Sequence, residues 1–289
     1  MEVEVYEFTP KPGVTLSPSE ARALLEGRLY TVNLGVDRVE RILTEDGMII
    51  VEARGERYRI PVEPLGEVAS DRYAWHVEGA RIARLAISGS GFKALEPTER
   101  GPPTLWIDGI HMHRISGTDP LRDARSKVRA ARVGKGDKVL DICTGLGYTS
   151  IEALKRGARI VVTVEIDEEV LYLARANPWS KMLASERVTV IHGDAVRVTG
   201  LLEPGFDKII HDPPRFSSRT GDLYSLEFYR SLHDLLKPGG TLFHYTGEPG
   251  RGRRVNLPGS VASRLARAGF IVAGYDRASQ GVVAYRPRR

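Results

Sequence analysis

Short apolar runs recur through the second half of the chain, and each one ends in an acidic residue or is soon followed by one. They cover residues 139–142, 159–165, 188–192 and 207–211. Runs of this length without strict alternation of apolar and polar positions are typical of strands buried on both faces. Between the first two lies a helical pattern from Ser150 to Arg156. We therefore predict an α/β fold with a doubly wound, mostly parallel sheet.

The first hundred residues show a different pattern. A helix start is indicated by Ser17, with proline next and glutamate three residues later, which is the sequence of a capping box. The turn at residues 44–47 separates two apolar runs and predicts a hairpin. We expect a small α+β unit with an antiparallel sheet, whose strands lie at residues 39–43, 48–52 and 58–62 and near 80–88 and 104–107.

The two patterns meet near Glu99–Thr104, where two prolines follow a glycine. Paired prolines continue neither a helix nor a central strand. We therefore predict an N-terminal α+β accessory domain over residues 1–105 and a larger α/β domain over residues 106–289. The larger domain begins with helical spacing from Leu121 to Val133.

The first buried strand of the larger domain runs into a glycine turn. Asp141 is followed by Gly145 and Gly147, and a helix is expected directly afterwards. Glycines allow positive φ and let the backbone approach a ligand, and the first N–H groups of the next helix face the turn. This arrangement indicates a nucleotide-like ligand, although a Gly-x-Gly turn alone also fits a simple strand-to-helix connection.

Acidic residues at four successive strand ends, together with the spacing Asp141-x-x-x-Gly145-x-Gly147, resemble the class I S-adenosylmethionine-dependent methyltransferases from about Gly117 to the C-terminus. The resemblance implies a Rossmann-like sheet of seven strands and S-adenosylmethionine as cofactor. It places the ribose on Glu165, the adenine amino group on Asp194 and the start of the catalytic loop at Asp212. The cofactor-binding residues it implies are Asp141, Thr144, Gly145, Gly147, Tyr148, Glu165, Ile166, Asp194 and Ala195.

The loop after the fourth strand carries the expected catalytic residues, which are Asp212, Pro213, Pro214, Arg215 and Phe216. It resembles the Asp/Asn/Ser-Pro-Pro-aromatic loop of the amino-methylating branch, in which a polar side chain and a backbone carbonyl grip an exocyclic amino group. In this chain the fourth position is Arg215 and the aromatic residue comes one place later. Arginine also stacks on bases or pairs with phosphates. We expect Phe216 to stack on the base.

Rival chemistries on the same fold remain open. Methylation at pyrimidine carbon 5 uses a cysteine nucleophile, and we expect the single cysteine, Cys143, to lie in the cofactor turn away from the catalytic loop. Aminopropyl transfer, and methylation of a small molecule or a protein, are the alternatives. A metal at His111 and His113 is not expected, because no third ligand has suitable spacing and transfer from a sulfonium needs no metal.

Charge is distributed unevenly along the chain. Residues 1–105 hold 13 Lys and Arg against 17 Asp and Glu, whereas the remainder holds 29 against 20. The basic residues concentrate in segments 114–138 and 251–289, which is the electrostatic pattern of a phosphate-binding face. A solvated, arginine-rich surface is the alternative interpretation of these segments. We predict RNA as the partner, with ribosomal RNA as the target and cytosine N4 slightly favoured over guanine N2 or adenine N6 by a loose likeness to archaeal methyltransferases of this two-domain type.

The N-terminus is acidic where a secretion signal would be basic and then apolar, and the chain has no long apolar run. We expect a cytoplasmic protein without a membrane span. A single cysteine excludes an internal disulfide. No pattern in the sequence sets an oligomeric state.

Overall fold

The structure is a computed structural model that describes residues 3–99, 101–248 and 256–288 of the 289-residue chain. Its contacts divide the chain into two compact units. Unit 1 comprises the described parts of Met1–Phe8, Arg122–Glu168 and Leu183–Arg289. Unit 2 comprises Thr9–Leu121 and Glu169–Met182.

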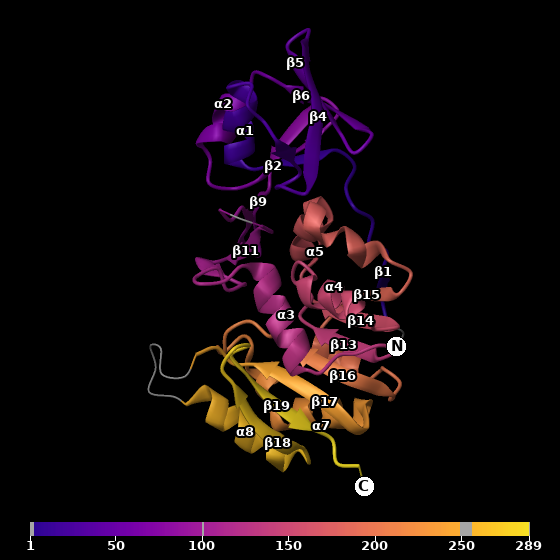
Figure 1. Ribbon diagram of the computed structural model, residues 1–289. Coiled ribbons are helices and arrows are strands. Elements are labelled where there is room, and N and C mark those ends of the chain that lie inside the picture. Colours follow the sequence, from indigo (N-terminus) through magenta and orange to yellow (C-terminus); the bar gives the residue numbers. More distant parts are fainter. Residues whose placement is uncertain (1–2, 100, 249–255, 289) are drawn as a thin grey trace. The chain divides into compact units, whose positions relative to one another are not determined.

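Unit 1 is built on an eight-stranded sheet with the order β1-β15-β14-β13-β16-β17-β19-β18 (Figure 1). Strands β13 to β17 are parallel, and β19 runs antiparallel to both β17 and β18. The strand bounds are β1 (Val5–Tyr6), β13 (Lys138–Ile142), β14 (Ile160–Glu165), β15 (Val188–His192), β16 (Phe206–His211), β17 (Leu236–Tyr245), β18 (Ile271–Asp276) and β19 (Gly281–Tyr285). The predicted doubly wound sheet is confirmed.

Helices cover both faces of this sheet because successive residues of each strand point to opposite sides. On one face, Leu140 and Ile209 pack with residues of α6, α7 and α8. On the other, Val139 and Ile210 pack with residues of α3 and α4. The helices of unit 1 are α3 (Pro120–Ala130, of which residues 122–130 fall in this unit), α4 (Tyr148–Lys155), α6 (Ala195–Thr199), η2 (Gly221–Tyr224), α7 (Leu226–Leu235) and α8 (Leu257–Arg267).

The eighth strand was not predicted. Val5 and Tyr6 form β1, which pairs antiparallel with Ile191 and Val190 of β15. The seven-stranded core is therefore extended at its edge by the start of the chain, which the sequence pattern assigns to the N-terminal domain. Two residues carry too little pattern to reveal a strand, because pairing at a sheet edge is set by backbone hydrogen bonds. The division at residue 105 stays a prediction.

Among the described residues, unit 2 contains three small sheets and the helices α1, α2 and α5, with part of the 3-10 helix η1. A core of Leu24, Ile60, Leu65 and Trp75 joins helices α1 and α2 to the strands. The strands are β2 (Val14–Leu16), β3 (Thr31–Val32), β4 (Asp37–Glu45), β5 (Met48–Ala53), β6 (Glu56–Pro61), β7 (Trp75–Glu78), β8 (Arg81–Arg84), β9 (Ala86–Gly89), β10 (Gly91–Glu96), β11 (Thr104–Ile107) and β12 (Ile110–His111), and the helices are α1 (Pro18–Leu25), α2 (Leu65–Ser70), α5 (Glu168–Ala176, of which residues 169–176 fall in this unit) and η1 (Pro178–Ala184, of which residues 178–182 fall in this unit).

The local signals in this unit are confirmed. The backbone N–H of Ser17 donates to the Glu20 carboxylate at 2.8 Å, and the backbone N–H of Glu20 donates to the Ser17 hydroxyl at 3.1 Å, so the capping box is complete. Asp46 and Gly47 both have positive φ, as a tight hairpin between β4 and β5 requires. These two features follow from local chemistry alone.

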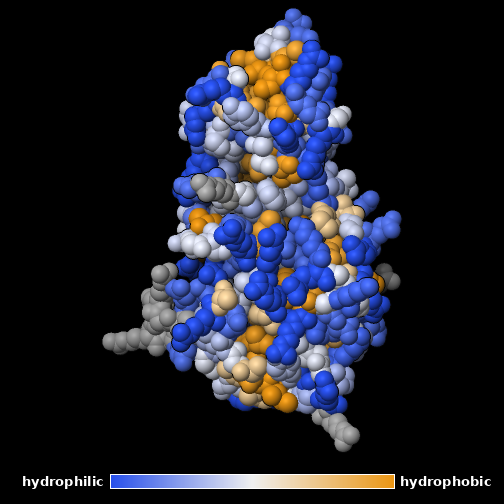
Figure 2. All heavy atoms as spheres, in the orientation of Figure 1, coloured by the Kyte–Doolittle hydropathy of each residue, from blue (hydrophilic) through white to orange (hydrophobic). Residues whose placement is uncertain are grey.

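The surface on view in Figure 2 is mostly hydrophilic, and its hydrophobic residues form small separate patches. Within the described ranges, no helix has the length and apolar content that crossing a membrane requires.

Candidate active site

The carboxyl ends of four parallel strands meet at one edge of the unit 1 sheet. Ile142 pairs with Val164 on one side and with His211 on the other, and Glu165 pairs with His192. Strand order reverses on the two sides of β13, and in open α/β sheets a ligand binds at such a switch point. The acidic residues predicted at these strand ends therefore come to one edge.

The glycine turn after β13 has the positive-φ backbone that the sequence indicated. Gly145 and Gly147 have φ of +54° and +76°. A Cβ at Gly145 would meet no atom within 4 Å, whereas one at Gly147 would lie 2.5 Å from the Leu183 side chain. Gly147 is therefore required by packing inside the protein, while Gly145 borders open space.

Asp141 is buried, and only one of its two carboxylate oxygens is hydrogen-bonded. Its Oδ2 accepts hydrogen bonds from the hydroxyls of Thr149 at 2.7 Å and Ser150 at 2.6 Å. Its Oδ1 has no hydrogen-bond partner among the described residues. Burial raises the pKa of Asp141 to about 7, against the lowering effect of the two hydroxyls. A buried acceptor without a partner calls for an explanation, and a bound cationic donor would supply one.

Glu165 is held at the end of β14 by backbone donors. The N–H of Gly145 donates to its Oε2 at 2.8 Å, and those of Ile166 and Asp167 donate to its Oε1 at 3.0 and 3.1 Å. Burial raises its pKa, and these backbone hydrogen bonds oppose that rise. Oε1 thus already accepts two hydrogen bonds, whereas Oε2 accepts one and keeps acceptor capacity for a further donor. Beside it, Ile166 is 63% exposed, which leaves an apolar surface next to the carboxylate.

The remaining predicted cofactor residues differ in exposure. Asp194 caps α6 by accepting from the N–H of Val196 at 2.9 Å, and its side chain is 42% exposed. Ala195 and Tyr148 are buried. The Thr144 hydroxyl bonds to that of Thr163 at 2.6 Å, so the Thr144 side chain is engaged with β14. Of these four, only Asp194 presents a polar side chain toward solvent.

Asp212, directly after β16, forms a buried ion pair that the sequence did not reveal. The Lys127 ammonium of α3 lies 2.6 Å from Asp212 Oδ2 and 2.9 Å from Asp123 Oδ2. It also lies 4.4 Å from the centroid of the Tyr245 ring. Asp212 Oδ1 makes no hydrogen bond within the described part of the chain, and the side chain keeps 18% exposure. One oxygen of Asp212 is therefore fixed and the other is open.

The charged groups of this cluster shift one another's pKa values. Burial lowers the pKa of Lys127, but the carboxylates of Asp212 and Asp123 outweigh burial and the pKa is raised, so the lysine stays cationic. Burial raises the pKa of Asp212, and the Lys127 cation opposes this rise. Two carboxylates and one ammonium leave a net charge of −1 at the catalytic edge.

Hydrogen bonds to its backbone carbonyls hold the loop after Asp212. The Thr220 hydroxyl donates to the carbonyl of Arg215 at 2.9 Å. The Tyr224 hydroxyl donates to the carbonyl of Pro214 at 2.8 Å. The Phe216 ring meets the Tyr224 ring edge-on at 5.2 Å and remains 38% exposed, while Arg215 is exposed. The aromatic and cationic side chains of the loop thus remain open to solvent. Stacking of Phe216 on a base stays a prediction.

The expected distance of Cys143 from the catalytic loop was wrong. Strands β13 and β16 are neighbours, and the N–H of Asp212 donates to the carbonyl of Ile142, the residue before Cys143, at 3.2 Å. Burial, together with the surrounding carboxylates, raises the pKa of Cys143 well above that of a free thiol. The thiolate is the nucleophilic form, so the raised pKa opposes carbon-5 chemistry.

Two buried histidines, His211 of β16 and His244 of β17, pack against each other near the catalytic loop. The Tyr229 hydroxyl and His244 Nε2 are 2.8 Å apart, and burial lowers the pKa of His244 to about 4. His211 packs against His244 and Phe228, with neither ring nitrogen hydrogen-bonded to a described residue, and burial lowers its pKa well below the usual value. Both rings are therefore neutral packing groups.

The paired histidines of unit 2 have structural partners. His111 contacts Glu96 at 3.0 Å and the edge of the Trp106 ring, and His113 contacts Thr104. Across residues 3–99, 101–248 and 256–288, no group of three His, Cys, Asp or Glu side chains is placed to hold a metal.

The sheet order, the glycine turn and the acidic strand ends define the class of protein. Unit 1 has the fold of the class I S-adenosylmethionine-dependent methyltransferases, a class whose cofactor is S-adenosylmethionine. The fold is similar to that of spermidine synthase from Thermotoga maritima, with a TM-score of 0.56 over 71% of this chain and 72% of that one at 18% identity. Likeness at this identity concerns the fold alone.

The chain belongs to the same family as the uncharacterized protein MJ1233 of Methanocaldococcus jannaschii. The two are 44% identical over 227 residues, which cover 78% of this chain and 77% of that protein. The profile of the family described as "Conserved hypothetical protein 95" matches residues 118–242. The chain is also 28% identical over 177 residues to the ribosomal RNA large subunit methyltransferase I of Salmonella arizonae, covering 58% of this chain but only 43% of that protein.

The residues at the strand ends fit the cofactor. The orphaned Oδ1 of Asp141 suits an ammonium group, and the first-turn N–H groups of α4 suit a carboxylate. The acceptor site left on Oε2 of the fixed Glu165 carboxylate suits a ribose hydroxyl, and the exposed Ile166 suits the face of an aromatic ring. The open space at Gly145 leaves room for the ligand. A methionine group, a ribose and an adenine together present these complementary groups.

Proposed function

We propose that the chain transfers the methyl group of S-adenosylmethionine to an exocyclic amino group of a base in RNA. Ribosomal RNA is the proposed substrate and cytosine N4 the favoured atom. The observation that carries the proposal is Asp212, a carboxylate with one oxygen held by Lys127 and the other open, at the start of a Pro-Pro loop beside the cofactor turn. An acceptor fixed in this way is suited to orient an N–H group.

Each of the predicted cofactor residues would bind a different part of S-adenosylmethionine. Asp141 would hold the ammonium group, Glu165 the ribose hydroxyls and Asp194 the adenine amino group, with Ile166 against the adenine face. When bound, the cofactor supplies a methyl group on a positively charged sulfur, which is already activated. The chain itself has to position the nucleophile and accommodate the charge that develops on it.

Asp212 performs both tasks in this proposal. Its open Oδ1 accepts one N–H of the substrate amino group and thereby turns the nitrogen lone pair toward the methyl group. Lys127 and Asp123 keep the carboxylate oriented, and their cluster carries a net charge of −1. A fixed negative charge beside the nitrogen stabilises it as it becomes cationic.

RNA as the substrate is supported by three observations. The relative from Salmonella arizonae is named a ribosomal RNA large subunit methyltransferase. The segment 114–138 is rich in basic residues, although Lys127 is buried in the active site and does not contribute to a surface. Arg215 and Phe216 are exposed on the catalytic loop and are suited to a phosphate or a base. Arg251, Arg253 and Arg254, which we expected to contact phosphates, lie outside the described residues.

Labelled S-adenosylmethionine, purified protein and ribosomal RNA transcribed in vitro test this proposal. We expect label in the RNA, and mass spectrometry of its nucleosides should locate the methyl group on an exocyclic nitrogen. Label at pyrimidine carbon 5 or on ribose would contradict the amino-group assignment. Label found only in protein or in a small-molecule extract would favour methylation of those substrates. Transfer of an aminopropyl group from decarboxylated S-adenosylmethionine to a polyamine would favour aminopropyl transfer.

A further inference from the structure

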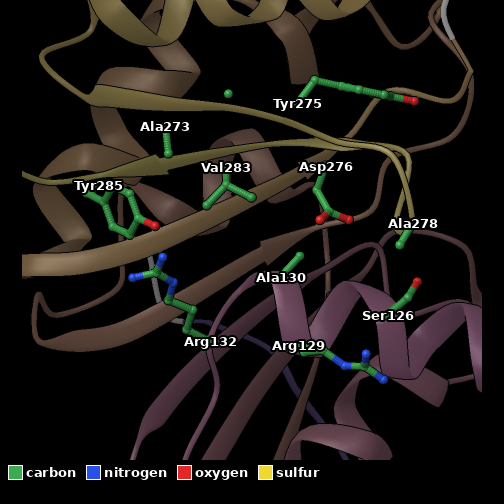
Figure 3. A pocket seen from close by; sticks show the side chains of 11 residues that line it. Ser126, Arg129, Ala130, Arg132, Ala273, Tyr275, Asp276, Ala278, Val283 and Tyr285 are labelled. Carbon is green, nitrogen blue, oxygen red and sulfur yellow. The ribbon is translucent and has the colours of Figure 1, made fainter.

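A hollow of about 400 Å³ lies in unit 1 between α3 and the last two strands of the sheet, β19 and the edge strand β18 (Figure 3). Ser126, Arg129 and Arg132 border it on the helix side, and Ala273 and Tyr285 border it on the strand side. Its volume falls in the range of roughly 300 to 1,000 Å³ that ligand sites occupy.

Small residues and the extent of α3 account for the hollow. Val128 and Ala131 pack α3 against the centre of the sheet, and α8 packs on the opposite face of β18 and β19. A register shift after Val272 places Gly274 at φ +135°, next to Ala273, which has only a methyl side chain. At Ala273 and Gly274, β18 therefore offers little side-chain volume to the hollow.

The charge in the hollow is positive. Arg129 and Arg132 are exposed, and neither side chain forms an ion pair or hydrogen bond within the described residues. The guanidinium carbon of Arg132 lies 5.1 Å from the centroid of the Tyr285 ring, and Figure 3 shows it reaching toward that ring. Asp276, the one acidic lining residue, is engaged by the backbone N–H and hydroxyl of Ser279 at 2.8 and 2.6 Å. Two cations thus remain for an anionic ligand.

The hollow begins beside the active site. Ser126 borders it, and the next residue, Lys127, holds Asp212. On the strand side, β19 starts at Gly281, which pairs with Tyr245, the ring beneath the Lys127 ammonium. Arg132 follows Ser126 by six positions, along α3 and the turn after it, which is roughly 9 Å at the helical rise of about 1.5 Å per residue. The cations of the hollow therefore lead away from the active site.

We propose that this hollow binds single-stranded RNA that leads away from the target base. Arg129 and Arg132 would pair with phosphates, and the Arg132–Tyr285 stack would accept the face of an unpaired base. The inference rests on the proposed function, because it assumes that the substrate is RNA, but it adds a subsite outside the catalytic loop.

Three variants test the subsite. Arg129→Ala/Arg132→Ala removes both cations, and Ala273→Trp fills the hollow without changing its charge. Arg159→Ala/Arg230→Ala is the matched control, because both arginines are exposed and lie outside the two basic segments, Arg159 just before β14 and Arg230 on α7. Binding of a short, fluorescently labelled single-stranded RNA is measured at several salt concentrations, and S-adenosylmethionine affinity is measured by calorimetry.

We expect Arg129→Ala/Arg132→Ala to weaken RNA binding about tenfold or more and to reduce the salt slope by roughly 1.4, from two lost contacts. Ala273→Trp should weaken binding with an unchanged slope. The control pair should bind RNA like wild type, and cofactor affinity should be equal throughout. Wild-type RNA affinity in the first two variants, or equal loss in the control pair, would overturn the subsite. If the wild-type chain neither binds nor methylates RNA, the proposed function fails together with it.

Discussion

Replacing Lys127 by methionine should destabilise unit 1 strongly, because it leaves two carboxylates without their cation. Asp123 and Asp212 are 1% and 18% exposed, and the lysine ammonium lies 2.9 and 2.6 Å from them. Removing one partner of a buried ion pair costs about 3 to 5 kcal/mol. Without Lys127, Asp212 avoids part of this cost by taking up a proton. Burial then raises the folded pKa of Asp212 above its unfolded value with no cation to oppose it, so the loss of stability is smaller near pH 5 and larger near pH 8.

Urea unfolding of the purified variant at both pH values measures this cost. Lys155→Met is the control, because Lys155 is 44% exposed and Glu152, its partner at 3.0 Å, also contacts Arg125 at 2.9 Å, so the loss should stay within about 1 kcal/mol. Adding Asp123→Asn to Lys127→Met should restore part of the stability. A Lys127→Met variant no less stable than Lys155→Met at pH 8 would refute the reasoning about this cluster.

Three further predictions concern the cofactor. Because the pKa of Asp141 is about 7, S-adenosylmethionine affinity should fall roughly tenfold per unit below pH 7 in wild type, and Asp141→Asn should flatten this dependence in calorimetric titrations. Gly145→Ala should weaken cofactor binding and cost about 1 to 2 kcal/mol of stability through its positive φ alone. Gly147→Ala, whose new methyl group also meets Leu183, should cost more stability than Gly145→Ala. Glu165→Ala should weaken binding by about 1 to 3 kcal/mol, and unaltered affinity would remove the ribose assignment.

Much of the fold followed from local sequence. The strands of unit 1 are recognisable because buried parallel strands are almost continuously apolar, and the acid after each strand marks the edge where a ligand binds. The capping box at Ser17 and the hairpin turn at Gly47 depend only on neighbouring residues. Features of this kind are encoded in short segments of the chain.

The unpredicted features depend on residues far apart in the sequence. Lys127 lies 85 positions before Asp212, and a lysine in a helix rich in arginine resembles a surface residue until the fold turns it inward. Its one local signal was Asp123, four positions earlier on the same helix. The nearness of Cys143 to Asp212 likewise depends on β13 and β16 becoming neighbours, which skips β14 and β15.

Turnover of the Asp212→Asn variant on ribosomal RNA tests the central claim most directly. Asparagine keeps the shape and an acceptor oxygen but removes the charge, and Lys127 retains Asp123 as its partner. Methyl transfer should fall roughly 10²-fold, about 2.7 kcal/mol, while S-adenosylmethionine affinity stays near that of wild type. A variant that methylates the exocyclic nitrogen at the wild-type rate would contradict the role of Asp212 in the reaction.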